Sequence, residues 1–157
     1  HNGRRRQRQM CIRDSLKLGK SIPILGICLG MQGIVHSFGG KIIHAKEPMH
    51  GKISFLLHDE KGIYEKIPQN IEIMRYHSLV VDIETLPDCF DINGISQEND
   101  NKNNILEIKQ ITPKCEIMAI SHKIYPIYGI QYHPESFGSE GGIEILQNFL
   151  FNDKSTK

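Results

Sequence analysis

The order of apolar and polar residues predicts strand–helix alternation at both ends of the chain. Residues 22–27 form a short apolar run of the kind found in buried parallel strands. Apolar residues then recur at helical spacing over 29–38, and the two glycines that follow are expected to end this helix. The same spacing over 143–150 predicts an amphipathic helix near the C-terminal end.

The middle of the chain is typical of short strands separated by polar turns. Strands are expected at 41–44, 53–57, 71–74, 79–81, 90–95, 105–108, 117–120 and 124–130. Within one of them, Asn93-Gly94 fits a tight turn or a β-bulge. We therefore expect an α/β fold, with a mostly parallel central sheet flanked by helices and an added antiparallel section.

Composition narrows the class of protein. The 157 residues are 39% hydrophobic and 24% charged, which suits a globular domain with a core. No apolar run approaches the ~20 residues of a membrane-spanning helix, and no secretory-signal pattern occurs. The net charge of +1 gives no reason to expect a nucleic acid or a membrane as partner. The four cysteines contain no CxxC pair, so we expect no zinc site of the finger type. Because no secretory-signal pattern occurs, we expect a cytoplasmic protein with reduced thiols.

The first 13 residues differ from the rest, because they hold five of the six arginines. A basic arm that binds nucleic acid and a disordered native tail are two interpretations. The third is that this segment is not native, since RRRQRQMCIRDS resembles translated sequencing-adapter DNA. We take the third, and treat residues 1–15 as a non-native or disordered head.

The segment Gly26-Ile27-Cys28-Leu29-Gly30 carries the first chemical signal. Glycines two residues before and after Cys28 allow a strained strand-to-helix turn that exposes a nucleophile. The helix N-terminus would favour the thiolate, and the Leu29 N–H is placed to donate to an oxyanion. The alternative is a buried structural cysteine at a strand end.

A cysteine nucleophile needs a base and a group that orients the base. Tyr132-His133-Pro134-Glu135-Ser136 offers His133 as the base and Glu135 as the orienting carboxylate. This segment follows an apolar run, and parallel strands bring such ends to the same edge as the cysteine turn. His77 in the segment RYHSL is the rival base, although no carboxylate lies near it in sequence.

The remaining histidines show no metal-ligand spacing, and we expect neither a metal nor a resident cofactor. His36, His44, His58 and His122 are interpreted as surface or partly buried side chains.

GICLGMQ, FGG, MHGK, RYHSLVV and QYHPES occur in this order over residues 21–150. Together they resemble the class I (triad) glutamine amidotransferases. They resemble most closely the glutaminase subunit shared by anthranilate synthase and aminodeoxychorismate synthase, to which MHGK and RYHSL point. The resemblance implies an α/β amidotransferase fold.

The resemblance also implies roles. Cys28 attacks the side-chain amide of L-glutamine, His133 activates the thiol and protonates the departing ammonia, and Glu135 orients His133. The implied substrate-binding residues are Leu29 through its N–H, Gln32, Ser78 and Leu79. The implied partner is the chorismate-binding large subunit (component I), which receives the ammonia within a hetero-oligomer.

The family begins with a strand, a helix and a Pro-Gly loop that do not precede Cys28 here. We therefore expect residues 16–157 to be a partial amidotransferase domain, truncated at its N-terminus. The resemblance implies that this loop supplies the second N–H donor to the oxyanion. Loss of one such donor costs ~2.7–4 kcal/mol, so we expect weak glutaminase activity from the chain as written.

The resemblance thus implies the glutaminase subunit of anthranilate synthase, in tryptophan biosynthesis, as the expected function. The alternatives are the glutaminase subunit of aminodeoxychorismate synthase in folate biosynthesis, a stand-alone cysteine hydrolase of the same fold, and a catalytically inert binding protein.

Overall fold

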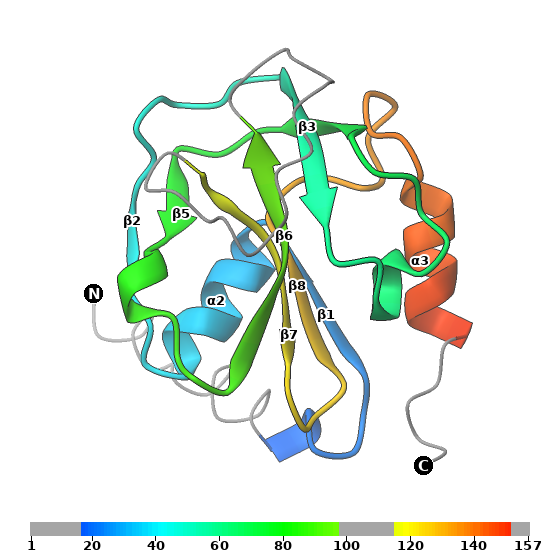
Figure 1. The fold of residues 1–157 in the computed structure, drawn as a ribbon. Helices are drawn as coiled ribbons and strands as arrows, with labels where there is room; N and C mark the ends of the chain where they lie inside the picture. Colours follow the sequence, from blue (N-terminus) through cyan, green and yellow to red (C-terminus); the bar gives the residue numbers. More distant parts are fainter. Residues whose placement is uncertain (1–16, 98–114, 152–157) are drawn as a thin grey trace.

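A six-stranded sheet forms the centre of the computed structural model, which describes residues 17–97 and 115–151 (Figure 1). In sheet order, its strands are β1 (Ile24–Ile27), β8 (Ile127–Ile130), β7 (Ile117–His122), β6 (Phe90–Gln97), β3 (Lys52–His58) and β4 (Ile71–Arg75). A second, two-stranded sheet pairs β2 (Ile42–His44) with β5 (Leu79–Val81). Two short 3₁₀ helices, η1 (Gly62–Tyr64) and η2 (Ile83–Thr85), lie in the connections.

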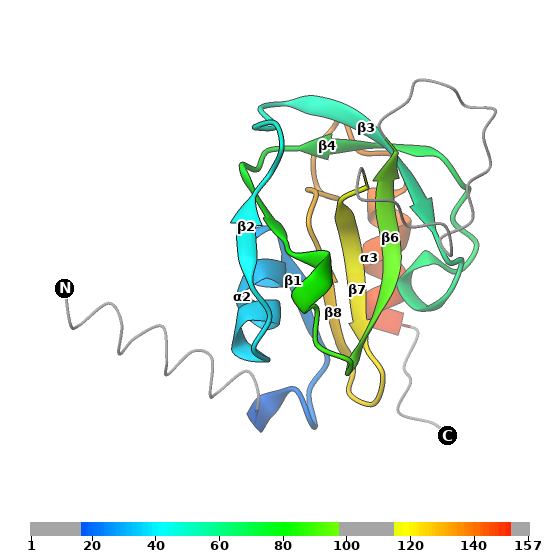
Figure 2. The same ribbon diagram turned by 60° about the vertical axis from the view of Figure 1, so that its left-hand side comes forward.

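Helices cover both faces of the central sheet. Helix α2 (Leu29–Ser37) packs into one hydrophobic cluster with residues of β6, β7 and β8. Helix α3 (Gly142–Phe151) reaches the other cluster through Ile145, beside η1 and buried side chains of β3, β4, β7 and β8. The two views place the helices apart, with the sheet between them (Figures 1 and 2). This arrangement explains why every described residue of β7 and β8 is buried.

The α/β class and the flanking helices are confirmed, but the proportion of parallel pairing differs from the prediction. Within the described central sheet, β1 and β8 are parallel, whereas the other four neighbouring pairs are antiparallel. For β7 and β8 the reason lies in their connection, because residues 123–126 alone join these two strands. A parallel pair needs a crossover of a dozen or more residues, so such a short link forms a hairpin.

Each strand and helix predicted within the described residues is present, although β1 begins at Ile24 rather than at residue 22 and β8 at Ile127 rather than at residue 124. The strand expected at 105–108 and the head at 1–15 lie outside the described residues. Asn93-Gly94 forms a bulge rather than a turn, since the pairing of β6 with β7 shifts on both sides of Gly94. The glycine stop after α2 is also present, because Gly39 has φ +97 and its N–H donates to His36 O at 3.1 Å. None of the described helices has the length and hydropathy to cross a membrane.

Candidate active site

Cys28 forms the single-residue turn between β1 and α2. Its φ of 52° and ψ of −105° are strained for a residue with a Cβ. Two backbone hydrogen bonds hold it: its N–H donates to Ile130 O at 2.7 Å, and its carbonyl accepts from Gln32 N at 3.2 Å. Gly26 lets the helix approach, because a Cβ there would lie 2.6 Å from the Gly30 carbonyl carbon. The strand–turn–helix geometry predicted for this segment is therefore present.

His133 and Glu135 lie just beyond the C-terminal end of β8. The Nδ1 atom of His133 and Oε1 of Glu135 are 2.7 Å apart. With the carboxylate ionised, Nδ1 carries the imidazole proton and Nε2 is left as the basic nitrogen. The backbone fixes this loop as well, since His133 N–H donates to Met74 O at 3.2 Å and its carbonyl accepts from Ser139 Oγ at 2.7 Å.

The cysteine turn and the His133–Glu135 pair leave the sheet at the same edge, because β1 and β8 are parallel neighbours. Burial by itself raises the pKa of Glu135. Its hydrogen bonds and the nearby His133 together lower that pKa by more than burial raises it, so the pKa lies below its usual value. Glu135 is thus ionised at neutral pH. Its negative charge disfavours the Cys28 thiolate and so raises the pKa of that thiol.

The Cys28 thiol has a pKa above its ordinary value. Burial raises the pKa most, the Leu29 N–H lowers it, the Glu135 charge raises it and a hydrogen bond from Gln131 lowers it. We expected the helix N-terminus to favour the thiolate. The Leu29 N–H does lower the pKa of Cys28, but the net shift of this pKa is upward, so the expectation is wrong for the net shift, because desolvation outweighs the hydrogen-bond donors. Cys28 is therefore a thiol at neutral pH, and it would need a base to act as a nucleophile.

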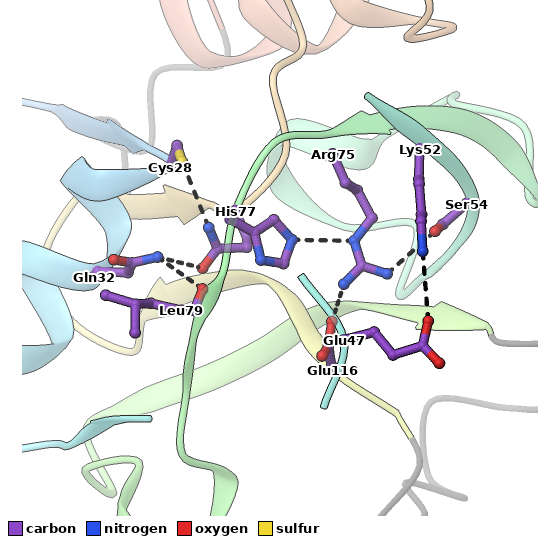
Figure 3. A network of polar contacts seen from close by, with 10 residues as sticks. Cys28, Gln32, Glu47, Lys52, Ser54, Arg75, His77, Leu79 and Glu116 are labelled. Carbon is purple, nitrogen blue, oxygen red and sulfur yellow. Dashed lines mark hydrogen bonds and ion pairs between the residues drawn. The ribbon is translucent and has the colours of Figure 1, made fainter. Parts of the chain in front are cut away.

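Behind the thiol lies a row of hydrogen-bonded amides (Figure 3). Gln32 Nε2 donates to Leu79 O at 3.0 Å and to Gln131 Oε1 at 3.1 Å. Gln131 Nε2 in turn donates to Cys28 Sγ at 3.7 Å. The sequence did not single out Gln131; the available signal was a polar residue directly between a buried strand and Tyr132-His133.

The structure thus brings most of the predicted residues together. Gln32 and Leu79 join Cys28 through the amide row, and the Leu29 N–H faces the thiol while the Leu29 side chain is exposed. Ser78 lies exposed next to Leu79, and its carbonyl accepts from Ala45 N at 2.9 Å.

A comparison with known families decides the assignment. The class-I glutamine amidotransferase family model matches residues 2–152. The chain belongs to this family. Anthranilate synthase component 2 of Leptospira biflexa is 46% identical over 138 residues, which make up 87% of this chain and 63% of that protein. Aminodeoxychorismate synthase component 2 of Escherichia coli is 40% identical over 129 residues, 82% of this chain and 60% of that protein.

The amidotransferase chain spans less than two thirds of the length of these relatives. The crystal structure of a glutamine amidotransferase from Thermotoga maritima aligns with a TM-score of 0.61 at 20% sequence identity. The alignment covers 93% of this chain and 51% of the other. It supports the fold.

His77, the rival base, is built into a different network of the amidotransferase domain. Its Nε2 accepts a hydrogen bond from Arg75 Nε at 3.1 Å, and Arg75 also donates to Ser54 Oγ at 3.1 Å and pairs with Glu116 (Figure 3). Burial, together with the Arg75 charge, lowers the pKa of His77 to about 4. A neutral imidazole whose basic nitrogen is already engaged does not fit the role of proton acceptor.

The MHGK and RYHSL segments lie side by side in this amidotransferase. Met49 N–H donates to His77 O at 2.8 Å, and Gly51 N–H donates to Arg75 O at 3.0 Å. The Tyr76 ring stands edge-on to His133, with 5.9 Å between the ring centroids. The two motifs that indicated the subgroup therefore form one wall beside the candidate base.

Two further features bear on the chemistry. In the part of the chain that the structure describes, no group of three or more His, Cys, Asp or Glu side chains is arranged to hold a metal ion. None of the cysteines at described positions takes part in a disulfide bond.

His77→Asn is expected to make the stability of the protein less dependent on pH. Unfolded His77 binds a proton near pH 6.5 and folded His77 near pH 4, so the unfolded state binds more protons between these values. Stability must therefore fall as the pH drops from 7 to 4, by roughly 3 kcal/mol from this residue alone at about 1.4 kcal/mol per pH unit.

Urea unfolding of the wild type and His77→Asn at several pH values between 7 and 4 measures this difference. Some slope will remain in the variant, because burial also lowers the pKa of His58 and His122. Identical slopes in the two proteins would show that His77 is protonated in the folded state as readily as in the unfolded one.

Proposed function

We propose that this chain is the glutaminase subunit of an anthranilate synthase, and that it hydrolyses L-glutamine through a thioester on Cys28. One observation carries the proposal: a strained cysteine turn and a His133–Glu135 pair emerge from adjacent parallel strands at one edge of the sheet. Its relatives named anthranilate synthase component 2 support the choice of enzyme.

The first half of the reaction forms the thioester. The Cys28 sulfur attacks the amide carbon of glutamine as its proton passes to Nε2 of His133, and Glu135 stabilises the imidazolium through Nδ1. The Leu29 N–H donates to the oxyanion of the tetrahedral intermediate. The C–N bond then breaks, and the imidazolium proton goes to the leaving nitrogen, which departs as ammonia.

The second half releases glutamate. Water attacks the thioester carbon and gives a proton to His133 Nε2. The C–S bond breaks, and the sulfur regains that proton as a thiol. Gln32 and the Ser78–Leu79 segment hold the glutamine during both halves, and the hydrogen bonds that join Gln32 to Cys28 and to Leu79 support this role.

We assign the ammonia to a chorismate-binding component I, bound to this chain in a hetero-oligomer in the cytoplasm. The names of the component 2 relatives support a partner of this kind. A relative named aminodeoxychorismate synthase component 2, at 40% identity, keeps that enzyme as the second candidate. An assay of each large subunit with chorismate, glutamine and this chain distinguishes the two candidate enzymes. The measured product is anthranilate in one case and aminodeoxychorismate in the other.

Covalent labelling with the diazoketone analogue of L-glutamine tests the glutaminase proposal without requiring fast turnover. The thiol proton goes to the diazo carbon, the sulfur bonds to that carbon as N₂ leaves, and peptide mass spectrometry locates the adduct. We expect labelling at Cys28, protection by L-glutamine and no protection by D-glutamine. Equal labelling of Cys89, or failure of L-glutamine to protect, would favour the inert binding protein. Glutamate release that the synthase large subunit leaves unchanged would favour the stand-alone hydrolase.

A further inference from the structure

Gln131 is a buried amide that the proposed reaction does not use. Its side chain is fully buried at 0% exposure, immediately after β8 and two residues before His133. Its backbone N–H donates to Met118 O at 2.8 Å, which fixes the main chain at this point. A polar side chain in such a position is costly unless its hydrogen bonds are satisfied, so its contacts define what it does.

Those contacts determine which end of the amide faces the thiol. The NH₂ group of Gln32 has two protons and no acceptor; one proton goes to Leu79 O and the other to Gln131. The Gln131 atom that receives the second proton must be the oxygen. The nitrogen of Gln131 therefore points at Cys28 Sγ, 3.7 Å away, as a hydrogen-bond donor.

We propose that Gln131 is a positioning residue that directs an N–H donor at the Cys28 sulfur and is itself oriented by Gln32 and the Leu79 carbonyl. The inference rests on the proposed function, in which Cys28 is the nucleophile. An N–H donor stabilises a thiolate more than a thiol, so it assists at the moment when the sulfur gives up its proton. The Gln131 N–H and the Leu29 N–H are thus two separate hydrogen-bond donors to the Cys28 sulfur.

The same row connects the thiol to the residues that hold glutamine. Gln32 and Leu79 are both in the proposed substrate-binding set, and Gln32 uses its NH₂ group within the protein. The orientation of Gln131 therefore depends on Gln32 remaining in place. A change at Gln32 should reach the sulfur through Gln131 as well as through the bound substrate.

The pH dependence of Cys28 alkylation by iodoacetamide tests this inference on the full chain. Gln131→Met keeps a side chain of similar length without a donor. Gln131→Glu keeps an acceptor for Gln32 and places a second oxygen toward the sulfur. We expect Gln131→Met to raise the alkylation pKa of Cys28 and to lower its rate at pH 7 roughly 2- to 10-fold, the range of one hydrogen bond. Gln131→Glu should raise that pKa further.

Cys89 provides an internal control in the same digest, because it lies before β6 and outside the amide row. Its alkylation profile should be the same in all variants, and circular dichroism confirms that each variant is folded. If the Gln131 variants fail to fold, Gln32→Met should shift the Cys28 profile in the same direction, because it releases the Gln131 amide.

An unchanged Cys28 profile in folded Gln131→Met and Gln131→Glu would overturn the inference and leave Gln131 a structural role. Alkylation by iodoacetamide requires neither glutamine nor a partner subunit. A chain that fails the glutamine-protection test but shows the shifted profile would therefore contradict the proposed function and retain the role of Gln131.

Discussion

Cys28→Ala should reduce glutamine hydrolysis to the background rate, a loss of about 10⁴-fold or more in an enzyme with a working triad. Alanine removes the only atom that can form the thioester. It also keeps a Cβ at the strained φ of 52°, so the turn itself changes little. Glutamate release and labelling by the diazoketone analogue should both disappear, while the folded structure remains.

The assembled synthase gives this prediction its sharpest control. In the proposed synthase, synthesis from free ammonia takes place on the chorismate-binding subunit, so it should continue when Cys28→Ala is bound to that subunit. Cys89→Ala should retain glutamine-dependent synthesis. Loss of both glutamine-dependent and ammonia-dependent synthesis in Cys28→Ala would instead point to a structural role for Cys28.

Gly142→Ala should damage stability and catalysis together. Gly142 is the first residue of α3, and a Cβ there would lie 1.8 Å from the Pro134 carbonyl oxygen and 2.8 Å from its carbon. These are backbone atoms, so the helix or the loop between His133 and Glu135 has to move. We expect a loss of about 2–3 kcal/mol in the free energy of unfolding, as in overpacked cores. Displacement of the base should lower glutamine turnover about 10²-fold.

Gly33→Ala is the matched control, because the same substitution within α2 meets no atom within 4 Å. A helical Gly-to-Ala change in open space should stabilise the protein by about 0.5–1 kcal/mol. Urea unfolding and glutamate release, measured side by side on both variants, give the comparison. Wild-type stability and turnover in Gly142→Ala would mean that α3 does not hold the His133–Glu135 loop in place.

Sequence patterns located the elements well because burial imposes them locally. The run that became β8 is apolar because both of its faces are covered, and α2 has an apolar stripe because one of its sides packs on the sheet. Strand direction was harder to predict. An apolar run does not indicate which strand will pair with it or in which direction. The short 123–126 connection made the pairing of β7 with β8 antiparallel.

The candidate site shows the same division. The turn at Cys28 was predictable from its flanking glycines, and the contact between His133 and Glu135 from their spacing of two residues. The role of His77 depended on Arg75 being held by Glu116, 41 residues away along the chain. The direction of the Cys28 pKa depended on desolvation, which arises only when remote segments have packed around the thiol.

The pairing of β1 with β8 also determines when the protein can become active during its synthesis. Cys28 and Gln131 are 103 residues apart, and their contact requires the closure of nearly the whole described chain. Contacts between such distant residues form late in folding. A ribosome that has released β1 and α2 therefore holds a cysteine turn whose base is still to be translated. The proposed nucleophile and its base can meet only after His133 has emerged.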